Sequence, residues 1–147
     1  MVDGFLGNSA LPALERSLQF MSARQRLLAT NLANAETPGF RPVDVDPRAF
    51  QGALREALDE GRLDGQGRLA FDDSAPVSFD GGDIELKPEV LADNILFHDG
   101  NDRSLERLMQ RMTENVYAFR AASQLMRNQF ELINTAIRGR LRHGRSQ

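Results

Sequence analysis

Apolar residues recur near the start of the chain at alternating intervals of three and four, which places their side chains along one side of an α-helix. Asn8 and Ser9 precede this pattern, and both residue types cap helices by accepting a first-turn N–H. Pro12 falls in the first turn, where its missing N–H costs little. The pattern predicts a helix of about 25 residues, roughly 37 Å long, that ends near Asn34. Its apolar seam consists of Leu11, Leu14, Leu18, Met21, Leu28, Leu32 and Ala35, with Gln25 as the one polar interruption.

A second seam of the same kind occupies the C-terminal third of the chain. We expect a helix over about residues 105–138, roughly 50 Å long, with Ser104 as its N-cap. A compact domain of 147 residues would be only about 30 Å across, so this helix should protrude or the molecule should be elongated. The seam residues are Leu105, Met109, Met112, Val116, Phe119, Ser123, Met126, Phe130, Ile133 and Ile137, and Leu108, Ala122, Leu125 and Leu132 widen the stripe on one side.

The middle of the chain, residues 41–100, has a different character. It contains four prolines and seven glycines, with 14 acidic and 6 basic side chains. The spacing of apolar residues predicts a short helix over 50–58 and short strands over 68–71, 77–79 and 84–86, with a turn at 80–83 between the last two. The composition is also compatible with disorder until a partner binds.

These patterns predict a mainly α fold, in which long N- and C-terminal helices pair as a coiled-coil-like bundle around an irregular or short-β middle segment. An antiparallel helical hairpin that forms the core of one small domain would explain the periodicity alone. The second seam is longer than the first, however, so pairing within one chain leaves part of it uncovered. An exposed apolar stripe makes a helix marginal and a protein adhesive, which favours neighbouring copies or another protein as its cover.

Charge is unevenly distributed along the chain. Residues 1–97 hold 9 basic and 16 acidic side chains, whereas residues 98–147 hold 9 basic and 5 acidic, within a net charge of -3. This asymmetry suits head-to-tail attraction between copies as well as it suits a nucleic-acid ligand, although solvated faces also explain it. The basic C-terminal residues have no groove-reading helix or base-stacking aromatics beside them, so we expect no nucleic-acid partner.

Candidate chemistry is sparse. The chain has no cysteine, and its two histidines, His98 and His143, have no second ligand at metal spacing. Residues 99–102 begin like a calcium loop, but Gln110 stands where the twelfth-position glutamate would be. The Asp72–Asp73 pair lies in surroundings that give no reason for a raised pKa. We therefore expect no enzyme activity, no cofactor and no metal, and we expect no direct membrane insertion because no segment approaches transmembrane length.

Residues 31–40, NLANAETPGF, close the first predicted helix, and residues 37–40 predict a turn in which Pro presets φ and Gly supplies a positive φ. This stretch resembles the N-terminal motif of the rod and hook family of the bacterial flagellum, N-(I/L)-A-N-x-x-T-x-G-(F/Y), at every position. Residues 24–26, 43–46 and 99–101 are also similar to that family, most of all to its proximal rod members. The residues that carry the resemblance are Asn31, Ala33, Asn34, Thr37, Pro38, Gly39, Phe40, Asp99, Gly100 and Asn101. Pro42, Pro47, Ser104 and a longer tail depart from the family pattern.

The resemblance implies a structural subunit of the flagellar basal-body rod, whose terminal helices pack around a central channel and transmit torque. It implies partners among other rod subunits, copies of this chain, the adaptor between rod and membrane ring, and the flagellar export apparatus. It also implies a place in the periplasmic rod after export without a cleaved signal peptide, which agrees with a start that has no basic region or long apolar run. A helical-hairpin adaptor for one unrelated partner is the alternative.

The expected organisation has five parts. A flexible N-terminus covers 1–8, and the first rod helix with its turn covers 9–40. The acidic middle segment, whose composition is compatible with disorder in the monomer, covers 41–100. The second rod helix covers 101–140 and a basic tail covers 141–147.

Overall fold

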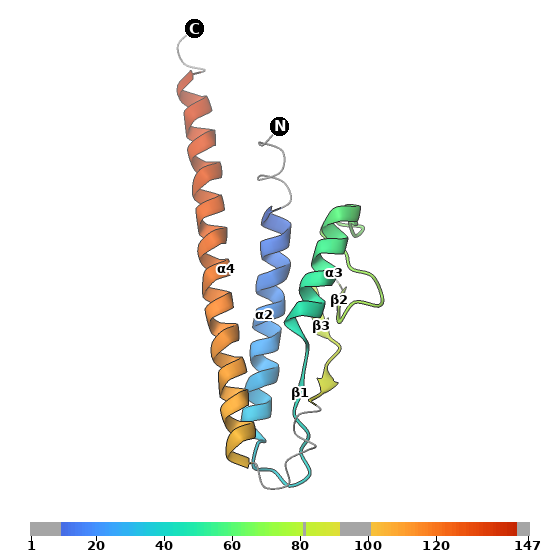
Figure 1. The fold of residues 1–147 in the computed structure, drawn as a ribbon. Coiled ribbons are helices and arrows are strands. Elements are labelled where there is room, and N and C mark those ends of the chain that lie inside the picture. The colour runs from blue at the N-terminus through green and yellow to red at the C-terminus, as the bar shows by residue number, and fades with distance from the viewer. Residues whose placement is uncertain (1–9, 81, 92–100, 144–147) are drawn as a thin grey trace.

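The computed structural model describes residues 10–80, 82–91 and 101–143, and its elements lie in layers along one central helix (Figure 1). Helix α2 (Ala10–Ala33) is central, and the longer helix α4 (Asn101–His143) runs antiparallel beside it. Helix α3 (Pro47–Glu60) and the short strands lie on the other side of α2. The predicted mainly helical fold with short antiparallel strands in the middle is confirmed.

The two long helices differ in how well their ends were predicted. Helix α2 has 24 residues and ends one residue before Asn34, close to the predicted length and end. Helix α4 has 43 residues, which is about 64 Å, and it begins at Asn101, so Ser104 lies inside the helix and is not its cap. Asp102 in the first turn favours this earlier start, because an acidic residue there complements the helix dipole. The predicted caps Asn8 and Ser9 lie outside the described residues.

Helix α3 begins three residues before the predicted helix because its start is well capped. The side chain of Asp46 accepts the N–H of Arg48 at 2.9 Å, and Pro47 supplies a first-turn φ suited to a helix. Gly61 ends the helix with a left-handed φ of 61°, a conformation that glycine adopts at little cost.

The strands form two separate two-stranded antiparallel sheets. Strands β2 (Val77–Asp80) and β3 (Asp83–Leu86) make the predicted hairpin. Strand β1 (Val43–Asp44) pairs with β4 (Glu89–Val90), a long-range contact that was not predicted. The strand predicted over 68–71 is wrong: only an isolated bridge joins Leu69 to Leu63, because the Asp64 carboxylate accepts the N–H groups of residues 66 and 68 and holds this stretch as a turn.

The main apolar core lies between α2 and the middle segment. Its buried centre consists of Phe20, Val45, Phe50 and Val77. Phe20 stacks on Phe50 with ring centroids 4.0 Å apart, and the series continues through Phe71 to Phe79 at 5.8 and 5.1 Å. Helix α2 therefore buries one face against these phenylalanines and a second face against α4.

Within the described part of the chain, no helix combines the length and the apolar character needed to span a bilayer.

Candidate assembly interface

The face of α4 that packs on α2 is centred on three residues seven positions apart. Leu108, Asn115 and Ala122 keep only 4%, 3% and 7% of their surface exposed. A seven-residue interval is close to two helical turns, so these side chains form one line. The predicted seam lies beside this line, and its half-buried members are Leu105, Met112, Val116, Ser123 and Met126.

A polar contact sits in the middle of this helix pair. The Asn115 side-chain amide donates to the Met21 carbonyl oxygen and to Gln25 Oε1, each at 2.8 Å. Gln25 is therefore the partner of Asn115, which explains the polar interruption of the first seam. The apolar members of that seam flank the contact: Leu28 is buried, and Leu11, Leu14, Leu18, Met21 and Leu32 are half-buried.

The C-terminal part of α4 extends past the start of α2 (Figure 1). Asn115 lies level with Met21 and Gln25, so Ala10 lies level with about residue 127 of the antiparallel partner. We call residues 127–143 the overhang. Its seam residues Phe130, Ile133 and Ile137 are 51%, 37% and 54% exposed, and they continue the same helix face that α2 covers lower down. The seam residues Met109 and Phe119 are exposed as well, at 53% and 39%.

A buried ion pair joins α2 to β1 and extends to α4. Arg24 donates two hydrogen bonds to the Asp44 carboxylate, at 2.8 and 2.6 Å, and both side chains are almost fully buried. Arg111 donates to the same carboxylate at 3.2 Å from α4. Since each charge is paired and hydrogen-bonded, burial of the pair is tolerated, and three elements are fixed at one point.

Asn31, the first residue of the 31–40 motif, joins α2 to β1 at a second point. Its amide nitrogen donates to the Val43 carbonyl at 2.6 Å, and its amide oxygen accepts the Val43 N–H at 3.2 Å. The side chain thus gives Val43 the two hydrogen bonds that an adjacent strand would give. Only 1% of Asn31 is exposed.

The remaining motif residues end the helix and turn the chain. Asn34 donates to the Thr30 carbonyl in the last turn both from its backbone N–H, at 3.1 Å, and from its side-chain amide, at 2.9 Å. The Phe40 N–H donates to the Thr37 carbonyl at 3.1 Å, and Gly39 has a φ of 77°, as the predicted turn requires. Ala33 is the last residue of α2. Of the C-terminal motif, Asp99, Gly100 and the side chain of Asn101 lie outside the described residues.

Arg16 is a buried cation on the side of α2 that faces the middle segment. Its Nε donates to the Leu69 carbonyl at 2.9 Å, and its guanidinium carbon lies 4.0 Å from the centre of the Phe79 ring. Burial lowers the pKa of Arg16. Within the described residues its Nη2 makes no hydrogen bond, and it lies 3.9 Å from Asp64 Oδ2. Arg16 holds the loop after α3 and the β2–β3 hairpin against the central helix.

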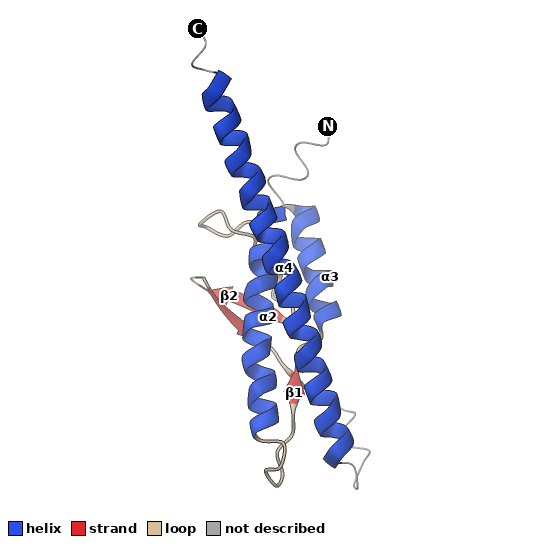
Figure 2. Ribbon diagram, turned by 90° about the vertical axis from the view of Figure 1, so that its left-hand side faces the viewer, coloured by secondary structure: helices blue, strands red, loops and turns tan. Residues whose placement is uncertain are grey.

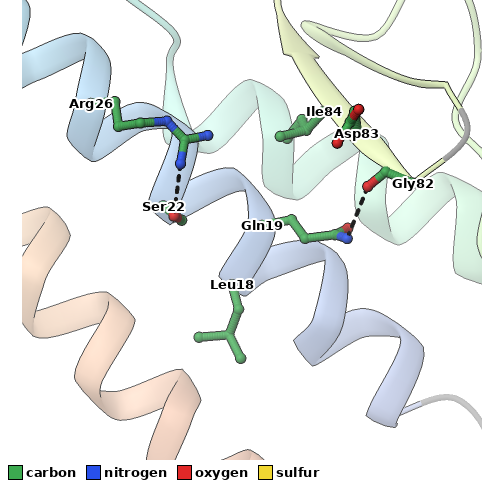
Figure 3. Close-up of a pocket in the computed structure, with 7 residues that line it drawn as sticks. All are labelled: Leu18, Gln19, Ser22, Arg26, Gly82, Asp83 and Ile84. Carbon is green, nitrogen blue, oxygen red and sulfur yellow. Dashed lines mark hydrogen bonds between the residues drawn. The ribbon is translucent and has the colours of Figure 1, made fainter.

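A surface groove runs along α2 between α4 and the β2–β3 hairpin. One hollow of about 590 Å³ lies on the hairpin side and is lined by residues that include Gly82, Asp83 and Ile84 (Figure 3). A second, of about 400 Å³, lies on the α4 side. Both share Ser22 and Arg26 of α2, so together they form one groove with α2 as its floor. Figure 2 shows the hairpin and α4 on opposite sides of α2.

Hydrogen bonds from backbone N–H groups stabilise the charged forms of two carboxyl groups, Asp64 and Asp72. The N–H of Arg68 and then that of Gln66 lower the pKa of Asp64, and the N–H of Ser74 lowers the pKa of Asp72. A carboxyl group that serves as a general acid needs the opposite shift. No group of three or more potential metal ligands occurs among the described residues. His98 and the side chain of His143 lie outside them.

Several residues that hold the interface together were not predicted. They are the buried polar side chains of Arg16, Arg24, Asp44 and Asn115. The spacing of apolar residues cannot identify buried residues that are polar. A signal was present for Asn115, since it stands midway between Leu108 and Ala122 at intervals of seven. The pairing of Arg24 with Asp44 required knowledge of where β1 lies.

The curated proteins reported below, which are similar to this chain in sequence, share the same name. It is 26% identical to the Borrelia hermsii "Flagellar basal body rod protein FlgB" over 126 residues, which is 84% of this chain and 91% of that protein. It is 37% identical over 60 residues to the protein of that name from Yersinia ruckeri and 36% identical over 55 residues to that of Escherichia coli. These two matches span 41% and 37% of this chain and only 42% and 38% of the relatives.

No protein-family model matches the chain, and no solved structure matches it with significance. The similarity thus rests on the shared name of the matching relatives and on one match, at 26% identity, that spans most of both chains. In sequence, the chain is therefore similar to the FlgB group of flagellar basal-body rod proteins.

Proposed function

We propose that this protein is a structural component of the flagellar basal-body rod and that α2 and α4 are the surfaces through which it assembles. The overhang carries this proposal. Its apolar residues Phe130, Ile133 and Ile137 continue the face that packs on α2 but remain 51%, 37% and 54% exposed. Such a stripe is costly in water and is explained by contact with other subunits.

The proposed partners follow from the similarity to flagellar rod proteins. Other rod subunits and further copies of this chain would cover the overhang, with the rod-to-membrane-ring adaptor and the export apparatus at the end of the rod. Long helices packed side by side around an axis would leave a channel for exported subunits and would transmit torque along their length. The names of the relatives and the 43-residue length of α4 support this role.

The direct test is the location of the protein. Basal bodies isolated from the source bacterium should contain the chain, as detected by mass spectrometry, and deletion of its gene should abolish rod assembly and motility. Intact basal bodies that lack the protein would contradict the proposal and favour an adaptor with one other partner.

Point substitutions test whether the overhang is the assembly surface. Phe130→Asp should abolish incorporation into basal bodies and motility while the protein is still expressed and folded, because Phe130 is 51% exposed in the isolated chain. Thr135→Asp is the matched control, since Thr135 lies on the exposed, opposite side of the same helix segment. Full motility of the Phe130→Asp strain would show that the stripe is not needed.

A further inference from the structure

We propose that the overhang of one copy docks in the α2 groove of the next copy, so that the chain associates head to tail through two different surfaces. This inference rests on the proposed structural role and specifies its self-contact. The observations that carry it are an apolar ridge and a groove on the same molecule and the opposite charges that flank them.

The ridge and the groove have matching character. Phe130, Ile133 and Ile137 project from one helix face over two turns. On its α4 side the groove is lined by Met21, Val116 and Phe119, and Leu18 and Ile84 line its hairpin side. Its floor, common to both hollows, is formed by Ser22 and Arg26 of α2. Figure 3 shows Leu18 and Ser22 on the stretch of α2 that lies between α4 and the hairpin.

Charge selects this pairing over contact between two overhangs. The overhang carries four arginines and one glutamate, whereas the β2–β3 hairpin, residues 77–86, carries three acidic side chains and no basic one. Two overhangs would therefore repel each other, and an overhang beside the hairpin is attracted. Asp83 lies on the hairpin side of the groove, whereas Arg26 lies on its floor and Arg120 on its α4 side.

The same charges set the direction of docking. Arg127 and Arg138 lie on one flank of the overhang's apolar stripe, and this flank would face Asp83 on the hairpin wall. The opposite direction would bring it beside Arg120 on the α4 wall, which disfavours that arrangement. Arg26 lies in both hollows, where its guanidinium donates to Ser22 Oγ at 3.4 Å.

A contact between two different surfaces repeats from copy to copy. Each oligomer keeps a free overhang at one end and a free groove at the other, so the association continues into a ring or an open helix. An isologous contact would stop at a dimer.

Sedimentation velocity of the purified full-length protein over a concentration series tests the proposal. The wild type should form a series of oligomers of increasing size. Higher salt should weaken this association, because it screens the charges. Ile133→Asp removes the apolar ridge and Ser22→Arg fills the groove with a cation. Each should weaken association roughly tenfold or more, as the loss of one buried apolar contact implies. Tyr117→Asp is the matched control on the exposed side of α4 and should associate like the wild type.

A mixture of the two variants gives the decisive result. Ile133→Asp retains an intact groove and Ser22→Arg retains an intact overhang, so the mixture should form one-to-one dimers and nothing larger. Circular dichroism confirms that each variant is folded. A wild type that stays monomeric at its highest concentration, or a mixture without dimers, would overturn the inference, and the presence of the protein in basal bodies would still stand as the separate test of the rod role.

Discussion

Asn31 illustrates how one side chain can join a helix to a strand. Its amide presents a donor and an acceptor in the arrangement of a peptide group, and both are used by the backbone of Val43. An aspartate lacks the donor and a leucine lacks both groups, so asparagine is the residue that fits. The 31–40 motif therefore begins with a residue whose role is structural.

Asn31→Ala should lower the free energy of unfolding by about 2 to 4 kcal/mol, because it leaves two partly buried backbone groups of Val43 without these partners. Urea unfolding followed by circular dichroism measures this change. Asn34→Ala is the control: its side chain is less buried and makes one hydrogen bond, so its cost should stay below about 1 kcal/mol. Equal costs for the two variants would refute the special role of Asn31.

The Arg24–Asp44 pair leads to a second prediction. Asp44→Ala leaves Arg24 as a buried charge without its main partner and should destabilise the protein by about 3 to 5 kcal/mol. The double variant Arg24→Met with Asp44→Leu should recover most of this loss, because no buried charge remains and Arg111 is partly exposed. Chemical unfolding of both variants decides this, and a double variant no more stable than Asp44→Ala would contradict it.

Asp64 gives a prediction about pH. Its pKa is lowered chiefly by the N–H of Arg68, so its bonds stabilise the loop fully above the ordinary carboxyl pKa of about 3.9. This stabilisation is lost as pH falls through the lower folded-state pKa. Amide signals of residues 62–75 in nuclear magnetic resonance spectra should be unchanged from pH 8 to 5 and should shift below about pH 4.

Asp64→Asn should remove the Asp64 part of that acid response, because an amide does not titrate in this range. It should also loosen the loop at neutral pH, since the charge-assisted bonds to Arg68 are weakened. An acid response identical to that of the wild type would show that another group governs the loop.

At the scale of elements, the periodicity of apolar residues predicted which helices and strands exist, but it did not predict which of them pair. The two long helices and the β2–β3 hairpin follow from local patterns, since their apolar residues recur with the period of each element. The β1–β4 pair joins residues 43–44 to 89–90, and two-residue strands leave no period to detect. The residues of α4 that pack most closely on α2 lie beside the predicted seam. The prediction missed them because Asn115 is polar and was therefore expected to be exposed, whereas it is buried.

The relation between α2 and α4 gives a prediction about truncation. Deletion of residues 127–147 removes the overhang but no residue of the buried Leu108, Asn115 and Ala122 line, so the urea midpoint should change little. A longer deletion of 116–147 removes Ala122 and should lower the midpoint clearly, because part of the α2–α4 contact is lost. A large loss from the shorter deletion would mean that the overhang packs within its own chain.

At the scale of the whole molecule, the protein combines a packed body with an extended arm. The body holds the phenylalanine core and the two junctions of α2 with β1, and the arm is the overhang. Sequence patterns predicted the elongation, because a helix of about 50 Å cannot fit inside a small globule. They could not predict the groove, since its floor and walls come from α2, α4 and β3, which are distant along the chain.

The stacked phenylalanines have a consequence for how the chain folds. Phe20, Phe50, Phe71 and Phe79 all precede the last third of the sequence, whereas Asn115 reaches Met21 across 94 positions. Contacts that close short loops form sooner than those that close long ones. The N-terminal two thirds can therefore assemble its core first, and α4 would join a body that is already formed.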